Sequence, residues 1–181
     1  MKTIVGVGGM PGTGKTTLMS KFVHQVEDWR PEKPIDLLDS IYSPALDLFV
    51  LGKYQPWYEG TGYAQGTDRL SMAVQPNAIE FVRHTKSNVL FEGDRLFTQS
   101  FLELCSVVGE LTVLMLGTDK RILQQRYEER NSTQSEQFIR SRETKLSNLG
   151  TNFDLMPYIE YHNNDTLEDH KNILERIGEI F

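Results

Sequence analysis

The feature that most constrains this chain is the glycine-rich segment GGMPGTGKTT at residues 8–17, which follows a short apolar run at residues 3–7. From Gly9 the segment matches G-x-x-x-x-G-K-[ST], the pattern of a phosphate-binding loop. Glycine permits positive φ angles and a close approach of the backbone to an anion, so successive N–H groups can form an anion nest. The helix expected at residues 15–26 adds the positive end of its dipole. The segment therefore predicts a nucleoside triphosphate site within a strand–loop–helix unit.

Two side chains of this loop have specific expected tasks. Lys15 is expected to reach the β- and γ-phosphates, and the hydroxyl of Thr16 is expected to bind Mg²⁺. The remaining loop residues are expected to hold the nucleotide, and they are Gly9, Pro11, Gly12, Thr13, Gly14 and Thr17. Kinases, ATPases and GTPase switches all use such a loop, so the rest of the chain has to separate these classes.

The composition is that of one globular domain, expected to span residues 1–181. The hydrophobic share is 39% and the charged share 24%, and no apolar run is long enough to cross a membrane. The N-terminus has no signal-peptide pattern, and the single cysteine, Cys105, lies in an apolar helical stretch. We therefore expect a buried thiol and a cytoplasmic protein. The net charge of −6 argues against a broad electrostatic grip on nucleic acid, although positive residues cluster between 120 and 145.

Apolar runs alternate with amphipathic segments along the chain. Five runs are expected to be buried parallel strands, at residues 3–7, 35–38, 88–91, 110–116 and 159–162. Helices are expected at residues 15–26, 76–84, 98–108, 119–130, 134–149 and 167–180. Thr166 and Asp169 fit a capping box at the start of the last helix. The alternation predicts an α/β fold with three layers, in which helices flank a five-stranded parallel sheet.

Asp39 follows the second expected strand, at the edge where ligands bind in open parallel sheets. A carboxylate there could face the γ-phosphate and accept the proton of an attacking hydroxyl. The alternative is that Asp39 caps a helix starting near residue 40 or 43. The two readings have equal weight at the level of the sequence.

The third expected strand ends in Glu92-Gly93-Asp94-Arg95. Glu92 or Asp94 could serve Mg²⁺, directly or through water, because an apolar strand that ends in acid resembles a Walker B element. Arg95 could clamp a phosphate of the acceptor, since its guanidinium matches phosphate oxygens. A surface turn with an Asp–Arg pair is the alternative.

Two irregular segments supply further candidates. Residues 52–68 mix aromatic residues with Gly and Pro, and Trp57 and Tyr58 could stack on a base on the acceptor side or, alternatively, pack on the core. Asn163 opens the turn after the last strand and could lie beside an adenine ring, although plain turn chemistry also explains it.

Arg126 and Arg130 are four residues apart and share a helix face. Positive charge placed where negative charge spreads in a transition state accelerates phosphoryl transfer. We therefore expect a lid at about residues 119–149 that closes over the nucleotide. The alternative is a solvated helix face with Glu–Arg pairs.

Together these features resemble the P-loop kinases of nucleotides and polynucleotide ends. The resemblance rests on residues 9–16, Asp39, residues 92–95, Arg126 with Arg130, and residues 163–165. It implies ATP with Mg²⁺ as the donor, a lid that closes on ATP, and an acceptor pocket between the second and third strands. No N-K-x-D guanine motif is present.

Two more segments, at 66–71 with Arg69 and at 138–145, resemble small phage-type P-loop kinases. Some of these are similar to the 5-hydroxymethyluridine DNA kinases, which phosphorylate a hydroxymethyl group within DNA. The favoured expectation is therefore a kinase acting on a hydroxyl of a nucleoside unit, with 5-hydroxymethyluracil in phage DNA as acceptor. The alternatives are a small-molecule kinase and, with less support, an NTP-driven ATPase switch.

Overall fold

The computed structural model describes residues 1–54, 67–129 and 134–181. The strands of this part of the chain are β1 (Thr3–Gly9), β2 (Arg30–Ile35), β3 (Leu38–Ser43), β4 (Leu48–Leu51), β5 (Asn88–Glu92), β6 (Glu110–Gly117) and β7 (Ile159–Asn163). The helices are α1 (Lys15–His24), α2 (Gln75–His84), α3 (Gln99–Val108), α4 (Lys120–Glu129), α5 (Glu136–Gly150) and α6 (Leu167–Ile180). Two short 3₁₀ turns are η1 (Thr67–Arg69) and η2 (Met156–Tyr158).

The strands form one mixed sheet in the order β2-β3-β4-β5-β1-β6-β7. The five strands from β4 to β7 in this order are parallel, and four of them (β5, β1, β6 and β7) lie where the sequence predicts parallel strands, whereas β2 and β3 add an antiparallel hairpin at the β4 edge. The total of seven strands differs from the expected five.

One of the five expected parallel strands is wrong. Residues 35–38 form the tip of the β2–β3 hairpin, where Ile35 pairs with Leu38 and Leu37 has a φ of 63°. The parallel strand at this place in the sheet is β4, whose register runs beside β5 from Leu48 to Leu51. Both segments are short apolar runs, and only pairing partners far along the chain separate a turn from a strand.

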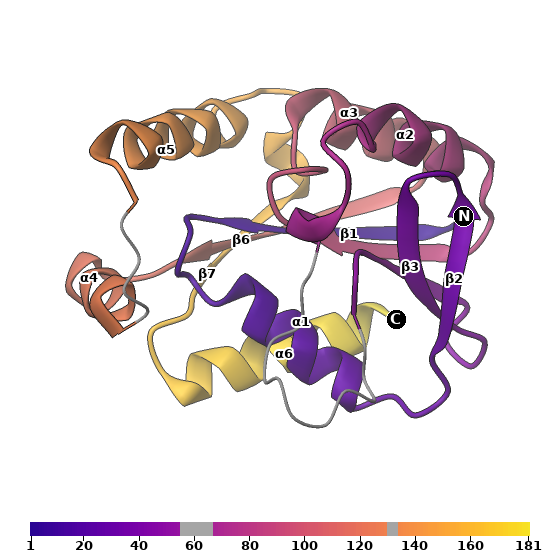
Figure 1. The fold of residues 1–181 in the computed structure, drawn as a ribbon, viewed down its shortest axis with the longest axis horizontal. Coiled ribbons are helices and arrows are strands. Elements are labelled where there is room, and N and C mark those ends of the chain that lie inside the picture. The colour runs from indigo at the N-terminus through magenta and orange to yellow at the C-terminus, as the bar shows by residue number, and fades with distance from the viewer. Residues whose placement is uncertain (55–66, 130–133) are drawn as a thin grey trace.

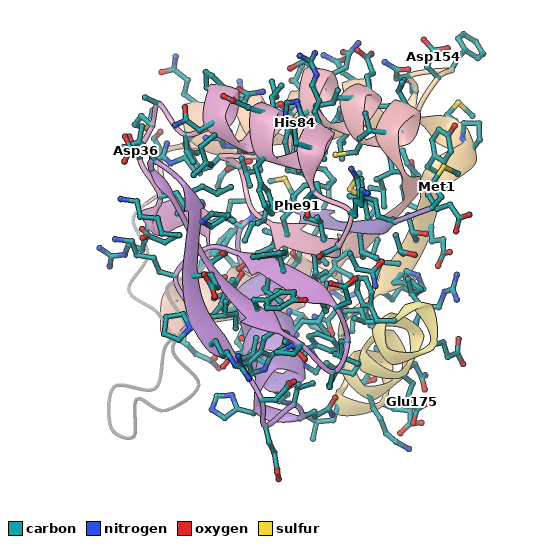
Figure 2. The ribbon with its side chains drawn as sticks, turned by 90° about the vertical axis from the view of Figure 1, so that its right-hand side faces the viewer. Met1, Asp36, His84, Phe91, Asp154 and Glu175 are labelled. Atoms are coloured by element: carbon teal, nitrogen blue, oxygen red, sulfur yellow. The ribbon has the colours of Figure 1, made fainter. Side chains whose placement is uncertain are left out.

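Helices cover both faces of the sheet and give three layers (Figure 1). Side chains alternate along β1, so Ile4 belongs to the core beneath α2 and α3 while Val5 and Val7 belong to the core that α1 and α6 cover. Phe91 of β5 is fully buried and meets Phe101 of α3 edge to face, with ring centroids 5.1 Å apart. Figure 2 shows Phe91 in the interior and Asp36 and Glu175 at the periphery.

Local signals in the sequence fix the helix starts well. The Thr166 side chain accepts a hydrogen bond from the Asp169 N–H, and the Asp169 side chain accepts one from the Thr166 N–H, which confirms the capping box.

Cys105 is a free, buried thiol on α3, and burial raises its pKa to about 12. Among the described residues, no helix combines the length and apolarity needed to cross a bilayer.

Candidate active site

The phosphate-binding loop joins the end of β1 to the start of α1 at Lys15. Gly12 and Gly14 have φ angles of 83° and 89°, a left-handed conformation that side chains with a Cβ rarely adopt. Within the loop, Lys15 Nζ donates to the carbonyl oxygens of Gly9 at 2.8 Å and Met10 at 3.0 Å. The Thr13 hydroxyl also donates to the Met10 oxygen, at 2.8 Å. The sequence pattern and the backbone conformation therefore agree.

Side chains from outside the loop hold its next three carbonyl oxygens. The donors are the hydroxyl of Tyr127 to Pro11 at 2.7 Å, the guanidinium of Arg126 to Gly12 at 3.1 Å, and the amide of Asn164 to Thr13 at 2.6 Å. The carbonyl oxygens from 9 to 14 thus all accept hydrogen bonds, since that of Gly14 accepts from the N–H of Leu18. In a trans peptide the C=O and the N–H point in opposite directions. Pro11 has no N–H and the N–H of Thr13 donates to the Met10 oxygen at 3.2 Å, so the peptides held in this way leave the N–H groups of Met10, Gly12, Gly14 and Lys15 for an anion.

Arg126 lies against backbone carbonyl groups in this structure. Besides Gly12, its guanidinium donates to the carbonyl oxygen of Asn164 at 2.9 Å. It therefore joins α4 to both the loop and the turn before α6, an arrangement that the sequence does not predict. Its expected part in stabilising a transition state stays a prediction, and Arg130 lies outside the described residues.

The segment expected to be a lid divides into two unlike parts. α4 lies beyond the carboxyl end of β6 and contacts the phosphate-binding loop (Figure 1). α5 is anchored at its C-terminal end, because Leu149 is 2% exposed and belongs to the core beneath α2 and α3. Closure of α4 over a nucleotide stays a prediction, whereas the end of α5 is a fixed part of the domain.

A hollow of about 330 Å³ opens beside the loop, between α1, α4 and α6. Its walls include Gly14, Lys21, Arg126, Asn164 and His170. Asn163, the residue expected beside the base, is exposed and does not line this hollow; its neighbour Asn164 does. The pKa of His170 is lowered by burial and, to a lesser degree, by the positive charges of Lys21 and Arg126.

Glu92 is the carboxylate on the strand next to the phosphate-binding loop. It pairs in register with Val7 of β1, two residues before Gly9, and is 2% exposed. The Tyr54 hydroxyl donates to Glu92 Oε1 at 2.9 Å, and the Thr67 hydroxyl donates to its backbone carbonyl. These contacts hold Glu92 in a fixed position at the carboxyl end of β5.

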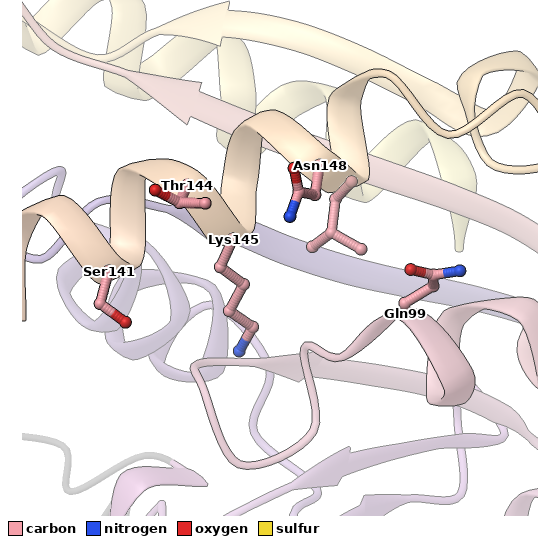
Figure 3. Close-up of a pocket in the computed structure, with 6 residues that line it drawn as sticks. Gln99, Ser141, Thr144, Lys145 and Asn148 are labelled. Atoms are coloured by element: carbon pink, nitrogen blue, oxygen red, sulfur yellow. The ribbon is translucent and has the colours of Figure 1, made fainter.

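Asp94 is held by two cations of α5. Arg142 Nε lies 3.1 Å from Oδ2 and Lys145 Nζ lies 3.3 Å from Oδ1, so both oxygens of Asp94 face positive charge. Figure 3 shows Lys145 extending from α5. Lys145 and Gln99 of α3 line a hollow of about 300 Å³. No cluster of three His, Cys, Asp or Glu side chains fit to hold a metal occurs in the described ranges. Which of Glu92 and Asp94 serves Mg²⁺ stays a prediction, and in this structure both oxygens of Asp94 already face cations.

Asp39 is the second residue of β3 and forms an ion pair with Lys53 at 3.5 Å. The alternative that it caps a helix is wrong, because residues 38–43 form a strand. β3 runs antiparallel to β4, so its first residues still lie at the edge where β4 ends, and the backbone carbonyl oxygen of Asp39 accepts from the Gly52 N–H at 2.9 Å. In the sheet, β4 and β5 lie between β3 and β1. With three strand spacings of about 4.8 Å, the strand that carries Asp39 lies roughly 14 Å from the strand that leads into the phosphate-binding loop.

The remaining residues expected on the acceptor side are Arg95, Arg69, Trp57 and Tyr58. Arg95 contacts the Met72 sulfur through Nη1, while its buried Nε has no partner in the described part of the chain. Arg69 is exposed at the end of η1. Trp57 and Tyr58 lie outside the described residues.

Three residues that contact the loop or support these contacts were missed from the sequence: Tyr127, Asn164 and His170. Tyr127 stands next to Arg126, and Asn164 next to Asn163, so the segments are right and the individual residues are not. The periodicity of α4 could have indicated Tyr127, which lies four residues after Leu123, and both face Gly12.

Comparisons with known proteins give distant structural matches. No protein-family model matches this chain, and no curated protein matches it. Similar solved structures include a shikimate kinase from Bacteroides thetaiotaomicron, with 15% identity and a TM-score of 0.47, covering 98% of this chain and 97% of that chain. A gluconokinase from Sinorhizobium meliloti 1021 has 14% identity and a TM-score of 0.49, covering 98% and 94%. A sugar kinase from Janibacter sp. HTCC2649 has 12% identity and a TM-score of 0.49, covering 98% and 92%. TM-scores below 0.5 at such identities carry no argument about this chain's reaction.

Proposed function

We propose that this protein is a P-loop kinase that transfers the γ-phosphate of ATP to a hydroxyl group of a small-molecule acceptor. The observation that carries the proposal is the phosphate-binding loop itself. Its pattern, its left-handed glycines and its six engaged carbonyl groups are what a bound polyphosphate requires. The α4 helix beside it would supply the cover that a kinase needs more than a simple ATPase does, and Arg126 would supply a cation once it leaves the carbonyl oxygens that it contacts here.

The loop fits ATP and Mg²⁺ in its conformation and in its donor groups. Lys15 would bind phosphate oxygens once its ammonium leaves the carbonyl groups of Gly9 and Met10. The Thr16 hydroxyl, half-buried at the start of α1, would hold Mg²⁺. When bound, Mg²⁺ neutralises charge on the phosphates. The hollow between α1, α4 and α6 would take the base, because it adjoins the same loop.

Two carboxylates are candidates for orienting the acceptor hydroxyl or removing its proton. Asp39 was expected in this role, and it would serve an acceptor that reaches about 14 Å across the sheet edge. Glu92 lies one strand from β1 and is the better placed for chemistry at the loop or for a metal-bound water. The proposal therefore gives Glu92 the position close to the phosphate and Asp39 a position farther along the acceptor side.

The contacts that the basic residues make within the protein favour a small-molecule acceptor over DNA. Arg126 holds the loop, Arg142 and Lys145 hold Asp94, and Arg140 pairs with Glu136. These side chains therefore do not form an open basic channel, which a grip on a DNA backbone would need. Phosphorylation of 5-hydroxymethyluracil in phage DNA stays the second candidate, because the basic segment still lies near the loop.

The test supplies γ-³²P-labelled ATP with sugars and hydroxy acids, nucleosides and nucleoside monophosphates, 5′-hydroxyl oligonucleotides, and duplex DNA with or without 5-hydroxymethyluracil. Label on a small molecule supports the proposal, and label only on hydroxymethylated DNA replaces it with the second candidate. ATP hydrolysis that no acceptor changes indicates an ATPase switch instead. The Lys15→Ala variant is the control, and it should transfer no label in any arm.

A further inference from the structure

Asn164 is 98% buried, and its backbone and side-chain polar groups are all engaged. Its side-chain Nδ2 donates to the carbonyl oxygen of Thr13 at 2.6 Å, and its Oδ1 lies 3.2 Å from Nδ1 of His170. Its backbone N–H donates to the carbonyl oxygen of Gly117 at 2.8 Å, and its backbone oxygen accepts from Arg126 at 2.9 Å. One residue in the turn before α6 thus joins the phosphate-binding loop to β6, α4 and α6.

The partners of Asn164 fix the orientation of its amide. A carbonyl oxygen can only accept, so the group that faces Thr13 is the NH₂, and the amide oxygen faces His170. The Nδ1 of His170 must then carry a proton and donate to that oxygen. The Nε2 of His170 is buried and has no partner among the described residues. Burial and the nearby cations Lys21 and Arg126 lower the pKa of His170, which favours the neutral ring.

The hydrogen bond from Asn164 to the carbonyl oxygen of Thr13 also sets the direction of the Gly14 N–H. The Thr13 oxygen and the Gly14 N–H belong to one planar trans peptide, so fixing the oxygen toward Asn164 fixes the N–H away from it. The fit is close, because a Cβ added at Gly14 would lie 2.6 Å from Asn164 Nδ2. Gly14 occupies the sixth position of the phosphate-binding pattern, where a backbone N–H serves as an anion donor.

We propose that Asn164, oriented by His170, is a positioning residue that holds the Thr13–Gly14 peptide so that the Gly14 N–H faces the bound phosphates. The inference rests on the proposed nucleotide site. It adds a pair of residues, distant in sequence from the loop, on which phosphate binding depends. Neither residue contacts the reacting atoms.

The test is binding of Mg²⁺-tripolyphosphate, measured by calorimetry, because this probe lacks a base and reports on the loop alone. Asn164→Ala and Asn164→Asp should each weaken binding about tenfold or more, since one loses the donor and the other sets an acceptor against the Thr13 oxygen. His170→Gln keeps an amide donor and should bind within about threefold of the wild type, whereas His170→Leu should lose about tenfold. Rescue by Gln but not by Leu is a result that simple loss of packing would not produce.

A second measurement needs no variant at Asn164. In the wild-type protein labelled with ¹⁵N, the Gly14 amide should shift on addition of Mg²⁺-tripolyphosphate, because its N–H gains an anionic acceptor. An unmoved Gly14 amide, or folded Asn164→Ala protein that binds the probe as tightly as the wild type, would overturn the inference. Binding that behaves as described, with no transfer to any acceptor, would remove the proposed kinase reaction and leave the positioning role standing. A wild type that does not bind the probe overturns both.

Discussion

Tyr127 lies directly over Gly12. A Cβ placed at Gly12 would be 2.8 Å from the Cε1 atom of Tyr127, and the Tyr127 hydroxyl donates to the carbonyl oxygen of Pro11 at 2.7 Å. Leu123 stands equally close to Gly12, at 2.9 Å from the same Cβ. The helix α4 therefore packs directly on the phosphate-binding loop, and a larger side chain at Gly12 would displace Tyr127 or Leu123.

Gly12→Ala should weaken ATP binding at least about tenfold and destabilise the fold by about 1–3 kcal/mol, because alanine meets both the left-handed φ of 83° and the wall of α4. Gly178→Ala is the matched control, since it lies in α6 with nothing within 4 Å of an added Cβ. That control should gain roughly 0.5–1 kcal/mol through helix propensity. Urea unfolding measures the stability of the two variants, and ATP titration measures their affinity. Equal stability and equal affinity would contradict the packing of α4 on Gly12.

Lys15→Ala should abolish turnover, with no transfer detectable, because the ammonium that would bind the phosphates is lost. Its folding should survive, since the hydrogen bonds described for it, to the carbonyl oxygens of Gly9 and Met10, are only partly buried. Initial rates of ATP consumption, with circular dichroism as a check on folding, measure this. A variant with wild-type turnover would exclude the loop as the site of chemistry.

Asp39→Asn and Glu92→Gln separate the two carboxylate candidates. Both should still bind ATP, and the one that acts on the acceptor hydroxyl should lower kcat by on the order of a hundredfold. The position of Glu92 on the strand beside β1 leads us to expect the larger loss there. Single-turnover transfer with labelled ATP measures the step directly. If Asp39→Asn transfers phosphate at the wild-type rate, its assignment as base is wrong.

Asp94→Asn should change stability by about 1 kcal/mol or less, because the pairs that Asp94 makes with Arg142 and Lys145 are partly exposed. It should also leave the Mg²⁺ concentration needed for half-maximal turnover unchanged, since both Asp94 oxygens already face cations. A rise of tenfold or more in that concentration would return Asp94 to the metal site. Glu110→Gln, at an exposed position of β6, controls for the loss of one negative charge.

The wild type should lose stability in mild acid through His170. The folded pKa of His170 lies below its ordinary value of 6.5, so the unfolded chain binds the proton more readily. The stability linked to this group is therefore complete above about pH 6.5 and decreases as the pH falls from there through the lowered folded pKa. His170→Gln cannot titrate and should lose less stability between pH 7.5 and pH 5.5 in urea unfolding. The exposed His24→Gln variant is the control, and parallel curves for His170→Gln and the wild type would refute the assignment.

Parts of the site that depend on neighbours in the sequence could be predicted from it. The phosphate-binding loop is one, because left-handed glycines and the start of α1 at Lys15 need only adjacent residues. The capping box of Thr166 and Asp169 is another, since its donors and acceptors lie within four residues. All six expected helices are present for the same reason: their apolar period and their end signals are local.

Features that depend on partners far along the chain could not be predicted from the sequence. Asp39 was assigned to the end of a parallel strand, and it lies in an antiparallel one, because strand direction is set by pairing with β4 and not by the apolar run itself. Asn164 meets Thr13 across 151 positions, and Asp94 meets Lys145 across 51. Local residue patterns were enough to predict a phosphate-binding loop within an α/β fold. The packing of α4 and of the turn before α6 against that loop places Arg126, Tyr127 and Asn164 on its carbonyl oxygens, and pairings over such separations along the chain are set by tertiary packing and not by local residue patterns.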